Sequence, residues 1–190
     1  MKARESGMPE EEMWDGFFNV KNILNELGVG SGVEKLVDLG CGYGTFTIAA
    51  AGKIKGQVFA FDIEEELVQA LDAKLKNINV NNVNVINRDF IARGTGLENE
   101  EADFVFLFNI LHAEESAAIL QEAYRILKKN GKAGIIHWKY DNSTPRGPSM
   151  PIRPRPEDLR SLLIKTGFSV IKYNISLPPY HYGILAQKTE

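Results

Sequence analysis

One stretch decides the fold of this chain, LVDLGCGYGT at residues Leu36–Thr45. Its beginning continues a short apolar run over Lys35–Leu39, which predicts a buried strand. Glycines follow at alternate positions 40, 42 and 44, and they let the backbone turn sharply and approach a ligand closely. The helix expected over Thr45–Lys53 directs free backbone N–H groups into the same space. The stretch therefore predicts a ligand site at a strand–loop–helix junction.

Strand and helix patterns alternate along the rest of the chain. Further strands are expected over Gln57–Asp62, Val83–Asn87, Ala102–Phe108, Lys132–Trp138, Phe168–Ser176 and Tyr180–Gln187. Helices are expected over Glu64–Asn77, Glu114–Lys129 and Pro156–Thr166, with Asn130-Gly131 ending the second of them. We expect an α/β fold, a doubly wound sheet of seven strands that is mostly parallel. The last two strands lack a helix between them, which predicts an antiparallel hairpin at the C-terminal edge.

Composition narrows the class of protein. The chain has 190 residues and a net charge of −3, which fits a single domain over residues 1–190 and disfavours nucleic acid as a partner. It has one cysteine and three histidines, so we expect no internal disulfide and no metal site. We find no signal peptide and no apolar run long enough to cross a membrane, and we expect a cytoplasmic protein. Two segments stand outside the alternating pattern, the arm of residues 1–20 and the loop of residues 139–155.

The charge around the glycine loop indicates what kind of ligand it holds. A dinucleotide fingerprint needs glycine or alanine where this chain has Thr45. Asp38 precedes the loop, and its carboxylate would repel a pyrophosphate but suits a ligand that carries an ammonium and a sulfonium. Asp62 lies 22 residues after Gly40, near the spacing at which an acid meets ribose hydroxyls in doubly wound folds. A helix N-cap is the alternative role for Asp62, and the two roles are compatible.

These motifs resemble those of class I methyltransferases that depend on S-adenosylmethionine (SAM). DLGCGYG is similar to their glycine-rich first motif and FAFDI to their acidic second motif. NRDF, ADFVFLFNILHAE and LKKNGKAGIIHW follow in the order of the later motifs, so the resemblance spans about residues 33–190. It implies a Rossmann-like fold, SAM as cofactor and methyl transfer as the activity.

The resemblance also implies roles in donor binding, which fall on Asp38, Gly40, Cys41, Gly42, Gly44, Asp62, Ile63, Asp89, Phe90 and Asn109. The glycines shape the loop around the methionine part of the donor, and Asp38 helps to hold its ammonium. Asp62 binds both ribose hydroxyls, and the isoleucine after it packs against the adenine. Asp89 accepts a hydrogen bond from the adenine amino group. Phe90 lies beside the ring, with plain core packing as its alternative role. The backbone of Asn109 borders the reaction centre.

The acceptor side of the site is less defined in the sequence. Methyl transfer from a sulfonium mainly requires positioning and exclusion of water, so a catalytic residue need not be evident. The candidates are His112, Tyr140 and Arg146. His137 and Trp138 are expected to pack in the core, and His181 is more remote. The loop also carries Arg153 and Arg155, which predict either a basic lid for an anionic acceptor or a solvated loop. The arm predicts either a lid over the donor or a cover for apolar surface.

Several functions remain open at this level. The leading hypothesis is a methyltransferase that acts on a small molecule. The alternatives are a methyltransferase for RNA or protein, an NAD-dependent oxidoreductase and a non-catalytic SAM-binding subunit. The acidic net charge disfavours the first alternative, and Asp38 and Thr45 disfavour the second.

Overall fold

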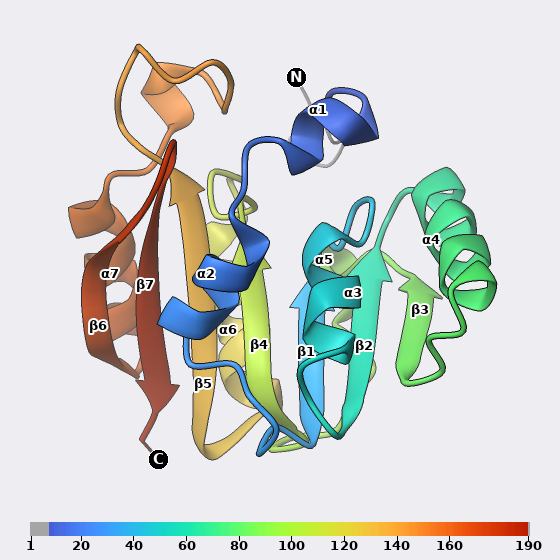
Figure 1. The fold of residues 1–190 in the computed structure, drawn as a ribbon. Coiled ribbons are helices and arrows are strands. Elements are labelled where there is room, and N and C mark those ends of the chain that lie inside the picture. The colour runs from blue at the N-terminus through green and yellow to red at the C-terminus, as the bar shows by residue number, and fades with distance from the viewer. Residues whose placement is uncertain (1–7, 190) are drawn as a thin grey trace.

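The computed structural model describes residues 8–189, and in this range the chain forms one seven-stranded sheet with helices on both faces (Figure 1). The sheet order is β3-β2-β1-β4-β5-β7-β6. The strands are β1 (Lys35–Leu39), β2 (Gln57–Asp62), β3 (Val83–Asn87), β4 (Ala102–Phe108), β5 (Leu127–Trp138), β6 (Phe168–Leu177) and β7 (His181–Lys188). The first five run parallel, and β7 is antiparallel to both β5 and β6. The predicted fold class and the edge hairpin are confirmed.

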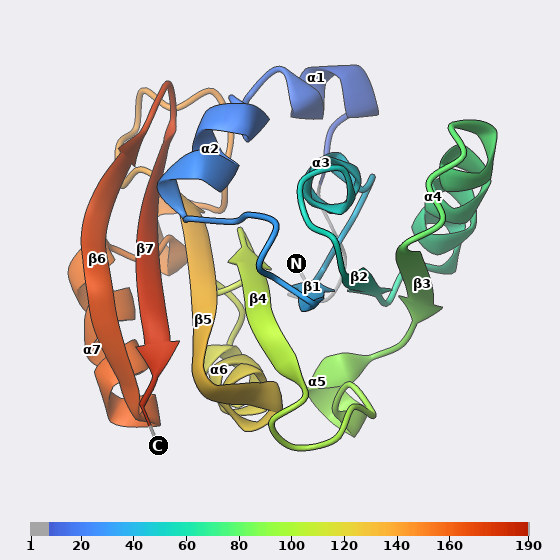
Figure 2. The ribbon, with the colours of Figure 1, turned by 60° about the horizontal axis from the view of Figure 1, so that its bottom comes forward.

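The helices form two layers that cover the sheet (Figure 2). They are α1 (Glu11–Asp15), α2 (Val20–Glu26), α3 (Thr45–Ala51), α4 (Glu65–Asn77), α5 (Phe90–Arg93), α6 (Ser116–Ile126) and α7 (Pro156–Thr166), with a short 3-10 turn η1 at Met150–Ile152. Helices α2, α3 and α4 lie on one face, and α5, α6 and α7 lie on the other. Strand β4 is buried against both layers, with Phe104, Phe106 and Phe108 in one core cluster and Val105 and Leu107 in the other. Burial on both faces explains its continuous apolar sequence.

The structure corrects one predicted helix. Helix α6 begins at Ser116 and ends at Ile126, inside the predicted span Glu114–Lys129. Leu127 already has extended backbone angles and pairs with Ala102 of β4. The predicted stop at Asn130-Gly131 lies inside β5, where Asn130 has a φ of 65°. Tertiary pairing therefore overrides the helix-forming sequence here.

The N-terminal segment is also more ordered than its sequence indicates. Helix α2 was not predicted, yet it buries Ile23 and Leu24 against the sheet. Asn19 caps it by accepting a hydrogen bond from the backbone N–H of Asn22 at 3.1 Å. The part of the predicted arm at residues 1–7 lies outside the described residues.

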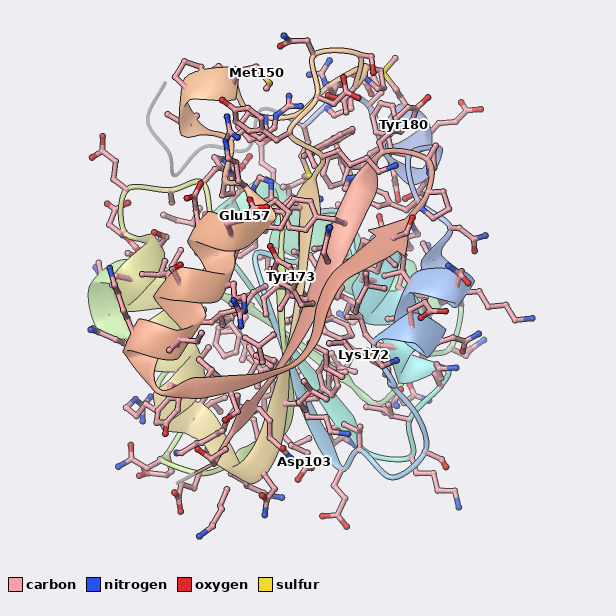
Figure 3. The ribbon with its side chains drawn as sticks, turned by 90° about the vertical axis from the view of Figure 1, so that its left-hand side faces the viewer. Asp103, Met150, Glu157, Lys172, Tyr173 and Tyr180 are labelled. Carbon is pink, nitrogen blue, oxygen red and sulfur yellow. The ribbon has the colours of Figure 1, made fainter. Side chains whose placement is uncertain are left out.

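The parallel strands give the molecule two distinct ends. The carboxyl ends of the parallel strands β1, β2, β4 and β5 all lie at one end of the molecule, and their amino ends lie at the opposite end. In Figure 3, Asp103 at the start of β4 lies at one end of the molecule, while Met150 and Tyr180 lie at the opposite end. The glycine loop and the long loop of residues 139–155 both follow carboxyl ends, where open α/β sheets bind their ligands.

Candidate functional site

The glycine loop has a backbone conformation that disfavours residues with a side chain. Gly40 and Gly44 have φ angles of 79° and 80°, in the left-handed region that glycine adopts without strain. A Cβ atom at Gly44 would also lie 2.2 Å from Cδ1 of Leu71 on α4. The backbone N–H groups of Gly40 and Cys41 both donate to the carbonyl oxygen of Phe61, at 2.8 and 3.0 Å. The loop is thereby tied to the end of β2.

Two acids border this loop from neighbouring strands. Asp38 is the penultimate residue of β1, is 3% exposed, and accepts a hydrogen bond from Thr47 Oγ1 at 2.6 Å. Asp62 ends β2 and accepts from the backbone N–H groups of Gly42 at 2.8 Å and Glu64 at 3.1 Å. Burial raises the pKa of Asp38 to about 7 and also raises the pKa of Asp62. Within residues 8–189 neither carboxylate forms an ion pair, so a positively charged ligand would relieve the cost of their burial.

The residues predicted to surround the adenine have local roles in the structure. Ile63 is 39% exposed directly after Asp62, where its side chain is accessible to a planar ligand. Asp89 caps α5 by accepting a hydrogen bond from the backbone N–H of Ala92 at 2.9 Å. Phe90 is buried in the core cluster of the α6 face, which is the core packing that its sequence left open. Their contacts with a donor stay predictions.

A cluster of polar side chains lies where β4 and β5 end. Asn109 follows β4 with a φ of 57°, and its backbone N–H donates to the carbonyl oxygen of Ile136. The rings of His112 and His137 are 5.6 Å apart between centroids and nearly perpendicular. Burial lowers the pKa of both histidines. Among the described residues, no group of three or more His, Cys, Asp or Glu is arranged to hold a metal ion.

Trp138 and His181 lie on the opposite face of the sheet from His137. They are direct cross-strand partners, and their ring centroids are 4.3 Å apart. His181 also stacks on Phe18 at 4.5 Å, and Phe17 packs edge-on against Trp138. The core packing expected of Trp138 is therefore observed.

The loop of residues 139–155 is ordered around one arginine. Arg153 is 8% exposed, and its guanidinium donates to Thr144 Oγ1 and to carbonyl oxygens of the same loop, those of Lys139, Asp141, Arg146 and Pro148. Arg155 instead lies over the ring of Tyr140, 4.1 Å from its centroid. The guanidinium of Arg153 is thus engaged within its own loop, and the choice between a basic lid and a solvated loop stays open. Arg146 is exposed.

The N-terminal arm lies across the glycine loop. Tyr43 donates its hydroxyl to the carbonyl oxygen of Pro9 at 3.1 Å, and Thr45 Oγ1 donates to Asp15 at 2.7 Å. The methyl end of Met8 is 2.8 Å from the position that a Cβ of Gly42 would take. Figure 1 shows α1 above the end of α3 at which the loop lies. The arm thus contacts the loop and also docks on apolar side chains through Phe17 and Phe18, while its role as a lid over the donor stays a prediction.

Comparison with known proteins identifies the same motifs. A model described as a methyltransferase domain matches residues 36–131. An uncharacterized methyltransferase-like protein of Schizosaccharomyces pombe is 28% identical over 110 residues, which are 58% of this chain and 40% of that protein. A demethylmenaquinone methyltransferase of Lactobacillus johnsonii is 26% identical over 163 residues, covering 74% of this chain and 65% of its own length. The chain thus spans less than two thirds of each of these relatives.

Solved structures share the whole fold. The crystal structure of a SAM-dependent methyltransferase from Aquifex aeolicus superposes with a TM-score of 0.82 at 24% identity, covering 94% of this chain and 93% of that one. At this identity the likeness shows the fold alone. No helix among residues 8–189 has the length and apolar character needed to span a membrane.

Proposed function

Because the chain belongs to the class I SAM-dependent methyltransferases, we propose that it transfers the methyl group of SAM to a small-molecule acceptor. The donor supplies a methyl group that its sulfonium has already activated. The work left to the protein is to bind the donor, to position the acceptor and to exclude water. Family membership removes the support for an NAD-dependent oxidoreductase.

One observation carries this proposal, the pair of buried acids at the glycine loop. Asp38 and Asp62 lie near the carboxyl ends of adjacent parallel strands, lack a cationic partner within the described range, and have pKa values raised by burial. A ligand that offers an ammonium to one acid and hydroxyl donors to the other satisfies both. We assign the ammonium to Asp38 and the ribose hydroxyls to Asp62. A pyrophosphate would instead face two carboxylates at short range.

The remaining donor contacts follow from their places in the fold. Gly40, Gly42 and Gly44 allow the loop to lie against the methionine part without side-chain obstruction. We assign the adenine to the surface beside Ile63 and Asp89. Met8 lies against Gly42, so the arm restricts access of water to the loop.

The segments that surround the carboxyl ends of the strands favour a small acceptor. The arm covers the glycine loop, and the loop of residues 139–155 rises beside it at the end of β5 (Figure 1). An end of the sheet that is bordered by two covering segments favours a small molecule over a folded protein or RNA. The net charge of −3 also disfavours a polyanionic acceptor.

Titration calorimetry with S-adenosylhomocysteine tests the donor site. The wild-type chain should bind this ligand and should not bind NAD. Asp62→Ala should weaken binding by roughly 1.5–3 kcal/mol, the scale for hydrogen bonds to a charged group. Asp103→Ala is the matched control, because Asp103 also accepts two backbone N–H bonds but lies at the other end of the sheet. Equal affinities of the two variants, or binding of NAD in place of S-adenosylhomocysteine, would refute the proposal.

A further inference from the structure

Three side chains at the ends of β4 and β5 share an unusual property. They are Asn109, His112 and His137, here called the Asn–His cluster. Both side-chain polar atoms of Asn109, Nδ1 of His112 and both ring nitrogens of His137 are buried without a hydrogen-bond partner among residues 8–189. His137 is 0% exposed. Folded proteins seldom leave buried polar atoms unpaired, since each costs about 1–3 kcal/mol.

The cluster lies beside the proposed donor site and on one defined face of the sheet. Asn109 directly follows β4, the strand that pairs with β1 and so neighbours the glycine loop. His137 pairs with Tyr182 across β5 and β7, and their rings are 6.3 Å apart between centroids. Tyr182 belongs to the core cluster of the α6 face. A ligand group that reaches the Asn–His cluster therefore approaches the donor from the end of β4.

The charge state of the Asn–His cluster limits which chemical groups it can bind. Burial lowers the pKa of His112 and holds that of His137 well below its usual range, so both rings are neutral at pH 7. The ionisable groups that act on His137 are His112, His181 and Arg153. The hydroxyl of Tyr182 already donates to the carbonyl oxygen of Pro154 at 2.9 Å. The donors of Arg153 are likewise engaged within its own loop. The cluster thus offers uncharged hydrogen-bonding nitrogens and one amide, and the guanidinium that acts on His137 is already engaged.

We propose that the Asn–His cluster binds the hydroxyl group of the methyl acceptor, and that this acceptor is a phenol or an enol. This inference rests on the proposed function. Asn109 orients the hydroxyl, and a ring nitrogen of His112, whose ring packs edge-on against that of His137, accepts its hydrogen bond. His112 is the reacting partner of the pair because it lies in the turn after β4 and is partly exposed, whereas His137 is enclosed behind it.

The reaction at this site balances without any further reagent. The acceptor oxygen forms a bond to the methyl carbon while the bond between that carbon and sulfur breaks, and the bonding pair stays on sulfur. The hydroxyl proton passes to the ring nitrogen of His112. An imidazole of lowered pKa suffices as a base, because the acidity of the hydroxyl rises steeply as its oxygen gains the methyl group. A weakly acidic hydroxyl matches such a base better than an alkyl alcohol does.

Three simple probes test which chemical group the cluster recognises. Phenol carries the hydroxyl, anisole carries the methyl ether in its place, and benzoate carries an anion. Each is titrated into the protein saturated with S-adenosylhomocysteine, and the imidazole resonances are followed by nuclear magnetic resonance. Phenol should shift the signals of His112 and His137 and leave those of His181 in place. Anisole and benzoate should bind roughly tenfold more weakly, as expected for one lost hydrogen bond.

Variants separate binding from packing. His112→Ala should weaken phenol binding about tenfold. His181→Phe is the control, because His181 also has buried ring nitrogens without a partner among residues 8–189 but lies on the other face of the sheet, and it should bind phenol like the wild type. Phenol affinity should be constant above pH 6.5, the ordinary pKa of histidine, and should fall below it as His112 gains a proton. His112→Gln should remove this pH dependence.

The outcomes distinguish this inference from the proposed function. If S-adenosylhomocysteine does not bind to the wild type, the proposed function fails. If it binds but phenol does not, or if anisole or benzoate binds as tightly as phenol, only the hydroxyl site is wrong. Equal phenol binding by His112→Ala and His181→Phe also overturns it, as does a pH dependence that survives in His112→Gln.

Discussion

The two ends of the sheet both carry buried or half-buried acids, but the chain treats them in opposite ways. At the amino end, Asp103 accepts hydrogen bonds from the backbone N–H groups of Glu34 and Lys35 and from Nζ of Lys128. Burial alone would raise the pKa of Asp103, yet these bonds together lower it. At the carboxyl end, Asp38 and Asp62 are more deeply buried, and their pKa values are raised.

The difference assigns a separate role to each end. A partnered acid stabilises the folded chain, whereas a buried acid that lacks a cation costs free energy unless it loses its charge or gains a ligand. Groups with perturbed pKa values of this kind gather at functional sites. The amino end therefore serves stability, and the carboxyl end retains buried acids that have no cationic partner among residues 8–189.

The largest effect that we predict is a loss of folding stability caused by a substitution in the glycine loop at the carboxyl end. Gly44→Ala should lower the free energy of unfolding by about 2–4 kcal/mol, because a φ of 80° is strained for alanine and the new Cβ meets Leu71. Gly28→Ala is the control near the amino end, where φ is 72° but no atom lies within 4 Å of a new Cβ. It should cost about 1–2 kcal/mol. Denaturant unfolding measures both, and equal losses would contradict the packing argument.

The second prediction sharpens the comparison by a difference in sign. At about pH 8, Asp38→Asn should stabilise the ligand-free protein by roughly 1–3 kcal/mol, since it removes a buried charge but keeps an acceptor for Thr47. Asp103→Asn should destabilise it by about 1–3 kcal/mol, because the backbone N–H groups of Glu34 and Lys35 then lose their charged acceptor, as Lys128 does. Denaturant unfolding at this pH provides the measurement. A loss of stability in both variants would show that the two ends do not differ.

The third prediction concerns pH at the carboxyl end. Asp38 holds its proton up to about pH 7 in the folded chain, against an ordinary pKa of 3.8. The ligand-free protein therefore loses stability at this group as pH rises from 3.8 towards 7. Donor binding should change in the opposite direction, because the ammonium of the donor favours the ionised carboxylate.

Calorimetry should show the affinity for S-adenosylhomocysteine rising about tenfold between about pH 6 and about pH 8. Asp38→Asn should bind more weakly and show no such rise. A rise that persists in this variant would assign the titration to another group.

Much of the structure at the carboxyl end could be predicted from the sequence, because it follows from local sequence patterns. The alternation of strands and helices fixed the sheet, and the glycines of the loop needed no tertiary information to be recognised. The positions of Asp38 and Asp62 beside this loop were predictable from the sequence alone. Their raised pKa values were not, since these depend on burial by distant segments.

What the sequence missed depends on contacts between distant residues. Leu127 belongs to a helical pattern but pairs with Ala102, so β5 begins earlier than expected. Helix α2 gave no clear signal because its stability comes from packing against the sheet. His137 was expected to be core, and only the fold brings it to His112, 25 positions earlier.

The smallest effect we predict tests whether ion pairs as such distinguish the two ends. The carboxyl end also has one, between Lys74 of α4 and Glu11 of the arm, whose side chains are 41% and 42% exposed. Exposed pairs contribute about 0–1 kcal/mol, because water screens them and long side chains lose entropy. Lys74→Gln should thus change the free energy of unfolding by less than about 0.5 kcal/mol and leave donor affinity unaltered. Phe17→Ala removes an arm side chain buried against Trp138 and should cost about 2–4 kcal/mol. If Lys74→Gln instead released the arm, measured as increased amide exchange at Tyr43 and Thr45, then charge rather than burial would hold this end together.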